Sequence, residues 1–90
     1  MKKSRDNRDL VALKNIGPTI ARRLNGIGVR SEEDLRRMGP AEAYRRMQAR
    51  EQSTLPACYY LYSLAGALEN RHWDDLSEEK KSALLKSAGR

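Results

Sequence analysis

The residues best suited to chemistry lie in two glycine turns, NIGP at positions 15–18 and NGIG at positions 25–28. Each turn stands directly before a helix-start signal. Gly17 permits a positive φ, and Pro18 suits a first helical position because its missing N–H has no helical partner to lose. Free N–H groups and the positive dipole end of a helix N-terminus can hold an anion. The chemistry that these turns could perform is therefore the binding of a phosphate group.

The first turn resembles a helix-hairpin-helix motif, in which the turn and the following helix N-terminus hold one phosphate of DNA. Asn15 stands where the first Gly of such a turn is usual, and Asn tolerates the left-handed conformation. Thr19 stands where a Lys is often found, so neighbouring cations would supply the charge. Such a contact positions a duplex without reading its sequence. The alternative to phosphate binding is a hairpin that serves only helix packing or a protein contact, and we give the two interpretations equal weight. The candidate DNA-phosphate residues are Gly17, Thr19, Arg22, Arg23 and Lys14.

The second turn is closer to the Gly-apolar-Gly pattern, but its helix opens with Glu32, Glu33 and Asp34. Carboxylates at this position would repel a phosphate, and they already satisfy the helix dipole. Ser31 followed three residues later by Asp34 also resembles a capping box. We therefore predict that the second turn is structural.

Basic residues are concentrated in the first half of the chain. The net charge is +6, and residues 1–50 hold 13 Lys and Arg against 6 Asp and Glu, whereas residues 51–90 hold 5 against 6. A basic half favours an anionic partner, for which nucleic acid is the commonest candidate, and guanidinium suits phosphate better than ammonium does. Arginine pairs on successive helices would form a basic patch if their faces align, and otherwise each is a solvated face. The candidate patch residues are Arg36, Arg37, Arg45 and Arg46.

Other kinds of chemistry are poorly supported. His72 and Cys58 are the only residues of their types and cannot supply the four ligands of a zinc site. No Walker loop, dinucleotide fingerprint or nucleophile elbow is present. No apolar run approaches the ~20 residues that a membrane span needs. We expect no enzymatic activity, catalytic residue, cofactor, metal, small-molecule substrate or membrane contact, and a single cysteine fits the reducing cytoplasm.

The elements that must position these residues are all helical. Ninety residues form one domain with a modest core, so a second subunit would help it. We predict a flexible basic lead-in over residues 1–8 and a single all-α domain over residues 9–88, a small bundle of five to six helices with two helix-hairpin-helix-like turns. The expected helices span residues 9–14, 18–25, 32–38, 40–50, 55–70 and 78–88.

The helix expected at residues 55–70 is the most apolar part of the chain. Leu61, Leu64, Ala65 and Leu68 form one stripe, with Cys58 at its start. A helix that is apolar on most sides is usually the central one of a bundle. We expect Thr54 to cap its start, and a left-handed Asn70 to end it.

Taken together, five segments resemble the C-terminal domain of TfoX/Sxy-type competence regulators. They are LKNIGP at 13–18, LNGIGVRSEEDL at 24–35, GPAEAYRRM at 39–47, LYSLAGAL at 61–68 and RHWDDL at 71–76. The resemblance covers residues 10–85 and implies a bacterial, cytoplasmic, all-α domain linked to the regulation of DNA uptake. Full-length members carry a separate N-terminal domain that this sequence lacks, so we expect a stand-alone copy.

Two functional hypotheses follow. The first is a non-enzymatic regulatory module that binds the DNA backbone weakly, without sequence preference, through the first hairpin. The second is a protein-interaction or dimerisation module without nucleic-acid contact, whose partner is a second copy or a protein of the transcription machinery. The apolar helix at residues 55–70 motivates the second hypothesis.

Overall fold

Six α-helices and one 3₁₀ turn make up the described part of the chain, which covers residues 8–52 and 54–89 of a computed structural model. No strand occurs within these ranges. The predicted all-α fold is therefore confirmed. The elements are α1 (Arg8–Val11), α2 (Pro18–Gly26), α3 (Glu32–Met38), α4 (Pro40–Ala49), α5 (Ala57–Glu69), η1 (Trp73–Asp75) and α6 (Glu78–Ser87).

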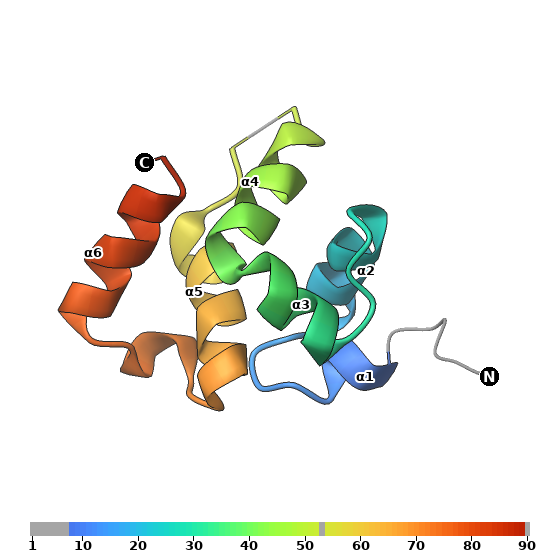
Figure 1. Cartoon of the computed structure of the whole chain (residues 1–90), viewed down its shortest axis with the longest axis horizontal. Coiled ribbons are helices and arrows are strands. Elements are labelled where there is room, and N and C mark those ends of the chain that lie inside the picture. Colours follow the sequence, from blue (N-terminus) through green and yellow to red (C-terminus); the bar gives the residue numbers. More distant parts are fainter. Residues whose placement is uncertain (1–7, 53, 90) are drawn as a thin grey trace.

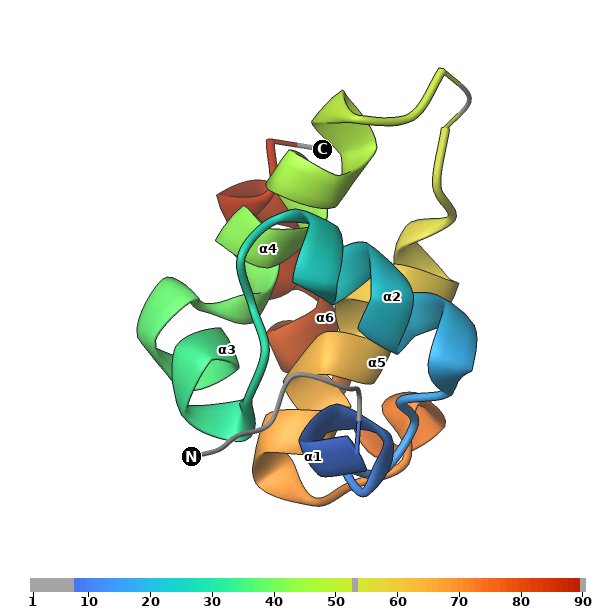
Figure 2. The same cartoon turned by 90° about the vertical axis from the view of Figure 1, so that its right-hand side faces the viewer.

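Helix α5 occupies the centre of the bundle, as its composition predicts. It contacts α3, α4, α6 and η1 (Figure 1). The view turned by 90° places α1 and α2 in front of α5, with α6 behind it (Figure 2). The predicted stripe of α5 is buried, apart from the half-buried Leu68. The side chain of Cys58, which we expected at the start of this stripe, lies outside the described residues.

Helices α2 and α4, which carry arginines, each bury one apolar face. Helix α2 buries Ile20, Ala21 and Leu24. Helix α4 buries Ala43, Tyr44 and Met47. Each set recurs at helical spacing, so the opposite face of the same helix turns its charged side chains towards solvent.

Two helix ends lie two or three residues from the expected positions. Helix α1 ends at Val11 instead of residue 14, because the chain turns at once through an N–H···O bond from Leu13 to Leu10. Helix α5 begins at Ala57 instead of residue 55, and Thr54 does not cap it. The residue before a proline is disfavoured in helical conformation, so Pro56 delays the start. Of the lead-in predicted over residues 1–8, residues 1–7 lie outside the described ranges and Arg8 already belongs to α1.

The segment between α4 and α5 is fixed to α4 through the backbone of Leu55. The Tyr44 hydroxyl donates to the Leu55 carbonyl oxygen at 2.5 Å. The Leu55 N–H donates to the side-chain oxygen of Gln48 at 2.6 Å. At the α4 end, the Glu51 N–H donates to the Gln48 carbonyl oxygen at 3.0 Å. Both ends of the segment are therefore held in place.

The first turn is tied to the far end of α5 by the side chain of Asn15. Its amide nitrogen donates to the carbonyl oxygen of Arg71 at 2.8 Å, and its amide oxygen accepts from the Trp73 N–H at 3.3 Å. Gly66 lies directly beneath this bridge, because a Cβ on Gly66 would lie 2.6 Å from the Arg71 oxygen and 2.7 Å from the Asn15 nitrogen. Asn70 ends α5 in the predicted left-handed conformation.

Candidate nucleic-acid interface

Asn15 is the left-handed residue of the first turn, a conformation that Asn tolerates, and Gly17 does not use the positive φ open to it. Asn15 has a φ of 74°, whereas Gly17 has a φ of −99° and acts as the N-cap of α2. Asn15 therefore performs the conformational role of the usual first glycine, and its side chain adds the bridge to Arg71. A Cβ on Gly17 would meet nothing within 4 Å, so the space beside the turn is open.

The N-terminus of α2 has no internal anion. Gly17 offers no side-chain acceptor, and the first turn of α2 contains no acidic residue. Thr19 is exposed in this turn. The N–H groups at the start of a helix lack intrahelical partners, so this terminus keeps its capacity to hold an anion.

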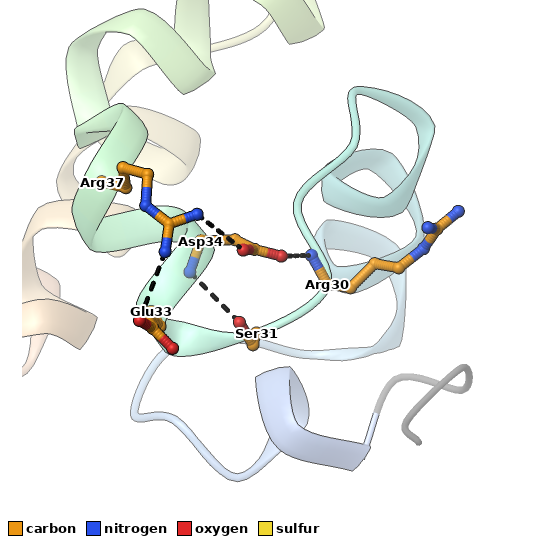
Figure 3. A network of polar contacts seen from close by, with 5 residues as sticks. All are labelled: Arg30, Ser31, Glu33, Asp34 and Arg37. Atoms are coloured by element: carbon orange, nitrogen blue, oxygen red, sulfur yellow. Dashed lines mark hydrogen bonds and ion pairs between the residues drawn. The ribbon is translucent and has the colours of Figure 1, made fainter. Parts of the chain in front are cut away.

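The helix N-terminus that follows the second turn, at the start of α3, is capped by side chains of the protein. The Ser31 hydroxyl accepts from the Asp34 N–H at 3.1 Å, and the Asp34 carboxylate accepts from the Arg30 N–H at 3.0 Å (Figure 3). This confirms the predicted cap, although the carboxylate reaches the residue before Ser31. Arg37 pairs with both Glu33 and Asp34. Protein groups already occupy this N-terminus, so the second turn fits the structural role predicted for it.

The end of α2 also differs from our prediction. The helix, which we expected to end at residue 25, continues through Gly26, and Gly28 adopts a positive φ of 91°. The Val29 N–H then donates to the Leu24 carbonyl oxygen at 2.9 Å, which is the six-to-one bond of a Schellman ending. Gly26 therefore lies within the helix, with its face open to a neighbouring side chain.

A cleft of about 260 Å³ runs along α2, opposite the end of α4. From α2 it is lined at helical spacing by Thr19, Arg22, Arg23 and Gly26, from α4 by Met47, and from the two residues after α4 by Arg50 and Glu51. The cleft thus brings together three of the five predicted phosphate residues. Lys14 is exposed in the turn before α2 and Gly17 caps that helix, and neither lines the cleft.

Arg23 is the most constrained of these residues. Its guanidinium pairs with the Glu51 carboxylate and lies 5.6 Å from the centre of the Tyr60 ring. Burial acts to lower the pKa of Arg23, but its interactions with Tyr60 and Glu51 outweigh this effect and raise the pKa above the ordinary value. Arg23 is therefore a charged residue that is already engaged inside the protein.

Arg50 is a cleft residue that we did not predict as part of the site. Its guanidinium packs across Gly26, with atoms 3.5–3.7 Å from the position of an added Cβ. The sequence places Arg50 on the same helix as Arg46, four residues later, but only the packing of α4 on α2 brings it to Arg22. No sequence signal that we used separates Arg50 from the other arginines of α4.

The predicted basic patch residues have carboxylate partners on their own helices. Arg36 pairs with Glu32 at 2.5 Å, and Arg37 pairs with Glu33 at 3.2 Å. Arg45 and Arg46 both pair with Glu42, at 3.4 Å and 2.7 Å. The hydrogen bond from Arg46, together with the nearby charge of Arg45, lowers the pKa of Glu42 despite an opposing effect of burial. Each of the four arginines is exposed, with part of its charge offset locally.

No grouping typical of a catalytic metal is present in residues 8–52 and 54–89. These ranges contain no cluster of three His, Cys, Asp or Glu side chains that could hold a metal ion. No helix within them is both long and apolar enough to cross a membrane.

These features define a small all-α domain with a basic cleft beside an open helix start. The family model described as the TfoX C-terminal domain matches residues 6–88. The chain therefore belongs to the TfoX C-terminal domain family, which confirms the resemblance found in the sequence.

One solved structure is similar along almost its whole length. It is a crystal structure of a protein of unknown function from Listeria monocytogenes, with 31% sequence identity and a TM-score of 0.78. The similarity covers 89% of this chain and 96% of that one. No curated protein matches this chain.

Proposed function

We propose that this protein is a non-enzymatic regulatory module that binds the DNA backbone weakly and without sequence preference through the first hairpin. Gly17 and Thr19 would present their N–H groups to one phosphate, while Lys14 and Arg22 supply charge. Arg23 would contribute through the field of its charge, since its guanidinium is engaged by Glu51. Membership of the TfoX C-terminal domain family supports a role in the regulation of competence or transcription.

The observation that carries this proposal is the contrast between the two turns. The start of α3 is closed by Ser31 and Asp34, whereas the start of α2 has no side-chain acceptor and no acidic residue. Exposed Lys14 and Arg22 flank the open start, and neither has an ion partner within residues 10–52 and 54–89. An open helix N-terminus between two unpaired cations is suited to a phosphate.

The test is a salt titration with labelled duplex DNA. Affinity should fall as salt rises, with a log–log slope of about 0.9 per phosphate contacted. Lys14→Gln and Arg22→Gln should each weaken binding and reduce that slope by about 1. Lys86→Gln is the matched control, because Lys86 is exposed on α6, on the opposite side of the bundle from α2 (Figure 1). No binding at low salt, or binding that salt does not change, would refute the proposal.

A second candidate is a protein-interaction or dimerisation module. A groove of about 460 Å³ between the start of α4 and α6 supports it, with apolar lining from Met38, Pro40, Ala41 and Leu84. The apolar character of α5, which motivated this hypothesis in the sequence, does not support it in the structure. Most of the apolar face of α5 is covered by the chain itself. A solution mass measurement tests self-association. A strict monomer would leave a different protein, such as one of the transcription machinery, as the only partner of this kind.

A further inference from the structure

The cleft along α2 holds an imbalance of charge. Three guanidinium groups, those of Arg22, Arg23 and Arg50, line it against the single carboxylate of Glu51. Like charges around one cleft repel each other and raise the local potential, which attracts an anion. The cleft lies beside the hairpin N–H groups but extends to the other end of α2, because Thr19 and Gly26 both line it.

The arginines without a carboxylate partner are concentrated in this cleft. Among the arginines whose side chains the structure describes, Arg23, Arg36, Arg37, Arg45, Arg46 and Arg71 have such partners. Arg22, Arg30 and Arg50 have none, and two of these three line the cleft. Both are exposed, so a polymeric ligand can reach them. The planar fork of guanidinium donors matches the oxygens of a phosphate.

Among the residues whose side chains the structure describes, Glu51 is the only carboxylate that lines the cleft. It pairs with Arg23, and their side chains are about one-third exposed, at 32% and 30%. A carboxylate in this position occupies donors that an incoming phosphate would otherwise use. It also lowers the positive potential that Arg22 and Arg50 create, so it opposes the binding of any anion in the cleft.

We propose that the cleft between α2 and the end of α4 binds a second backbone phosphate of DNA through Arg22 and Arg50, and that the Glu51 carboxylate competes with this phosphate. The inference rests on the proposed function, because it assigns a further contact of the same DNA. The cleft contact differs from the hairpin contact in its residues, since Arg50 and Glu51 have no part in the hairpin contact.

Two substitutions of opposite sign test the inference in the same duplex titration. Arg50→Gln should weaken binding about fivefold and lower the salt slope by about 1. Glu51→Gln should tighten binding about three- to fivefold, the size expected of an exposed ion pair. Lys86→Gln is the matched control for Arg50→Gln, because it removes one exposed positive charge on α6. Glu79→Gln is the matched control for Glu51→Gln, because it removes one exposed negative charge on the same helix. Thermal unfolding of each variant verifies that it is folded.

The outcomes separate the inference from the proposed function. If Arg22→Gln and Lys14→Gln weaken binding while Arg50→Gln and Glu51→Gln behave like their controls, the cleft contact is wrong and the hairpin contact stands. If the wild-type protein binds no duplex at low salt, both are wrong. Inorganic phosphate, added at constant ionic strength, identifies the source of the anion. Binding of inorganic phosphate that Arg50→Gln abolishes, together with a duplex affinity that Arg50→Gln leaves unchanged, would overturn the assignment to the DNA backbone.

Discussion

The side-chain amide of Asn15 donates a hydrogen bond to the carbonyl oxygen of Arg71, 2.8 Å away and 56 residues further along the chain. This bond joins the turn before α2 to the chain that leaves α5. The orientation of α2, and hence of its cleft, therefore depends on a residue that also sets the conformation of the turn. Asn15, Gly66, Arg71 and Trp73 all lie in segments that carry the family resemblance, and the structure brings them together in one cluster.

Substitutions of Asn15 separate its two roles. Asn15→Gly keeps the positive φ but leaves the Arg71 oxygen and the Trp73 N–H without their partner, which should lower the free energy of unfolding by about 1–3 kcal/mol. Asn15→Ala should cost about 1–2 kcal/mol more, because Ala is strained at positive φ. Urea unfolding of both variants measures the difference. Equal stabilities would show that the left-handed conformation carries no cost here.

Gly66→Ala should be strongly destabilising. The new Cβ would come within 2.7 Å of two polar atoms, one of them the backbone oxygen of Arg71. We expect a loss of about 2 kcal/mol or more, since overpacking outweighs the better helix propensity of Ala. Gly17→Ala is the control, because its Cβ meets nothing within 4 Å and its φ of −99° suits any residue. If both variants unfold at the same urea concentration, the close approach of α5 to the Asn15 bridge is wrong.

Ser31→Ala should lower the free energy of unfolding by about 1 kcal/mol, because it removes the side-chain cap of α3. DNA affinity should stay unchanged, since the second turn is structural. Ser82→Ala, on the exposed face of α6, serves as the control and should raise stability slightly through helix propensity. A large loss of DNA affinity in folded Ser31→Ala would contradict the structural role of the second turn.

Glu42 should make stability depend on pH in the acidic range. Its pKa is lowered in the folded state by Arg46 and Arg45, so its stabilising effect is complete above the pKa of the unfolded glutamate and is lost as the pH falls through the lower folded value. Glu42→Gln should therefore unfold at a lower temperature than the wild type above about pH 5, with a difference that shrinks below about pH 4. Thermal unfolding across this range measures it, and a difference that stays constant would argue against the ion pairs.

Most of the fold could be predicted from local patterns. The cap at Ser31 and the central place of the apolar helix α5 both followed from residues close together in the sequence. The features that the sequence did not predict depend on distant partners. Asn tolerates the left-handed conformation that Asn15 adopts, but the side-chain bridge of Asn15 joins it to partners 48 to 58 residues away. The start of α5 was misplaced for a local reason, the effect of Pro56 on Leu55.

The candidate site could be predicted only in part, for the same reason. Thr19, Arg22 and Arg23 share one helix, so their proximity follows from helical spacing. Arg50 and Glu51 reach them only through the packing of α4 on α2. The ion pairs of Arg45 and Arg46 with Glu42 join residues three and four apart on one helix, but the pairing of Arg23 with Glu51 joins residues that no local pattern connects.

The fixed position of Glu51 has a consequence for the kind of anion that can compete with it. Its N–H is bonded to the carbonyl oxygen of Gln48, so the carboxylate is tethered beside Arg23. A tethered group acts at an effective concentration that dilution does not change, on the order of millimolar or higher. A free monovalent anion must exceed that concentration to displace it. In a duplex held by the hairpin, the neighbouring phosphates would also be tethered and would also act at a high effective concentration. The cleft would therefore bind a polymeric anion by avidity in preference to a small free anion.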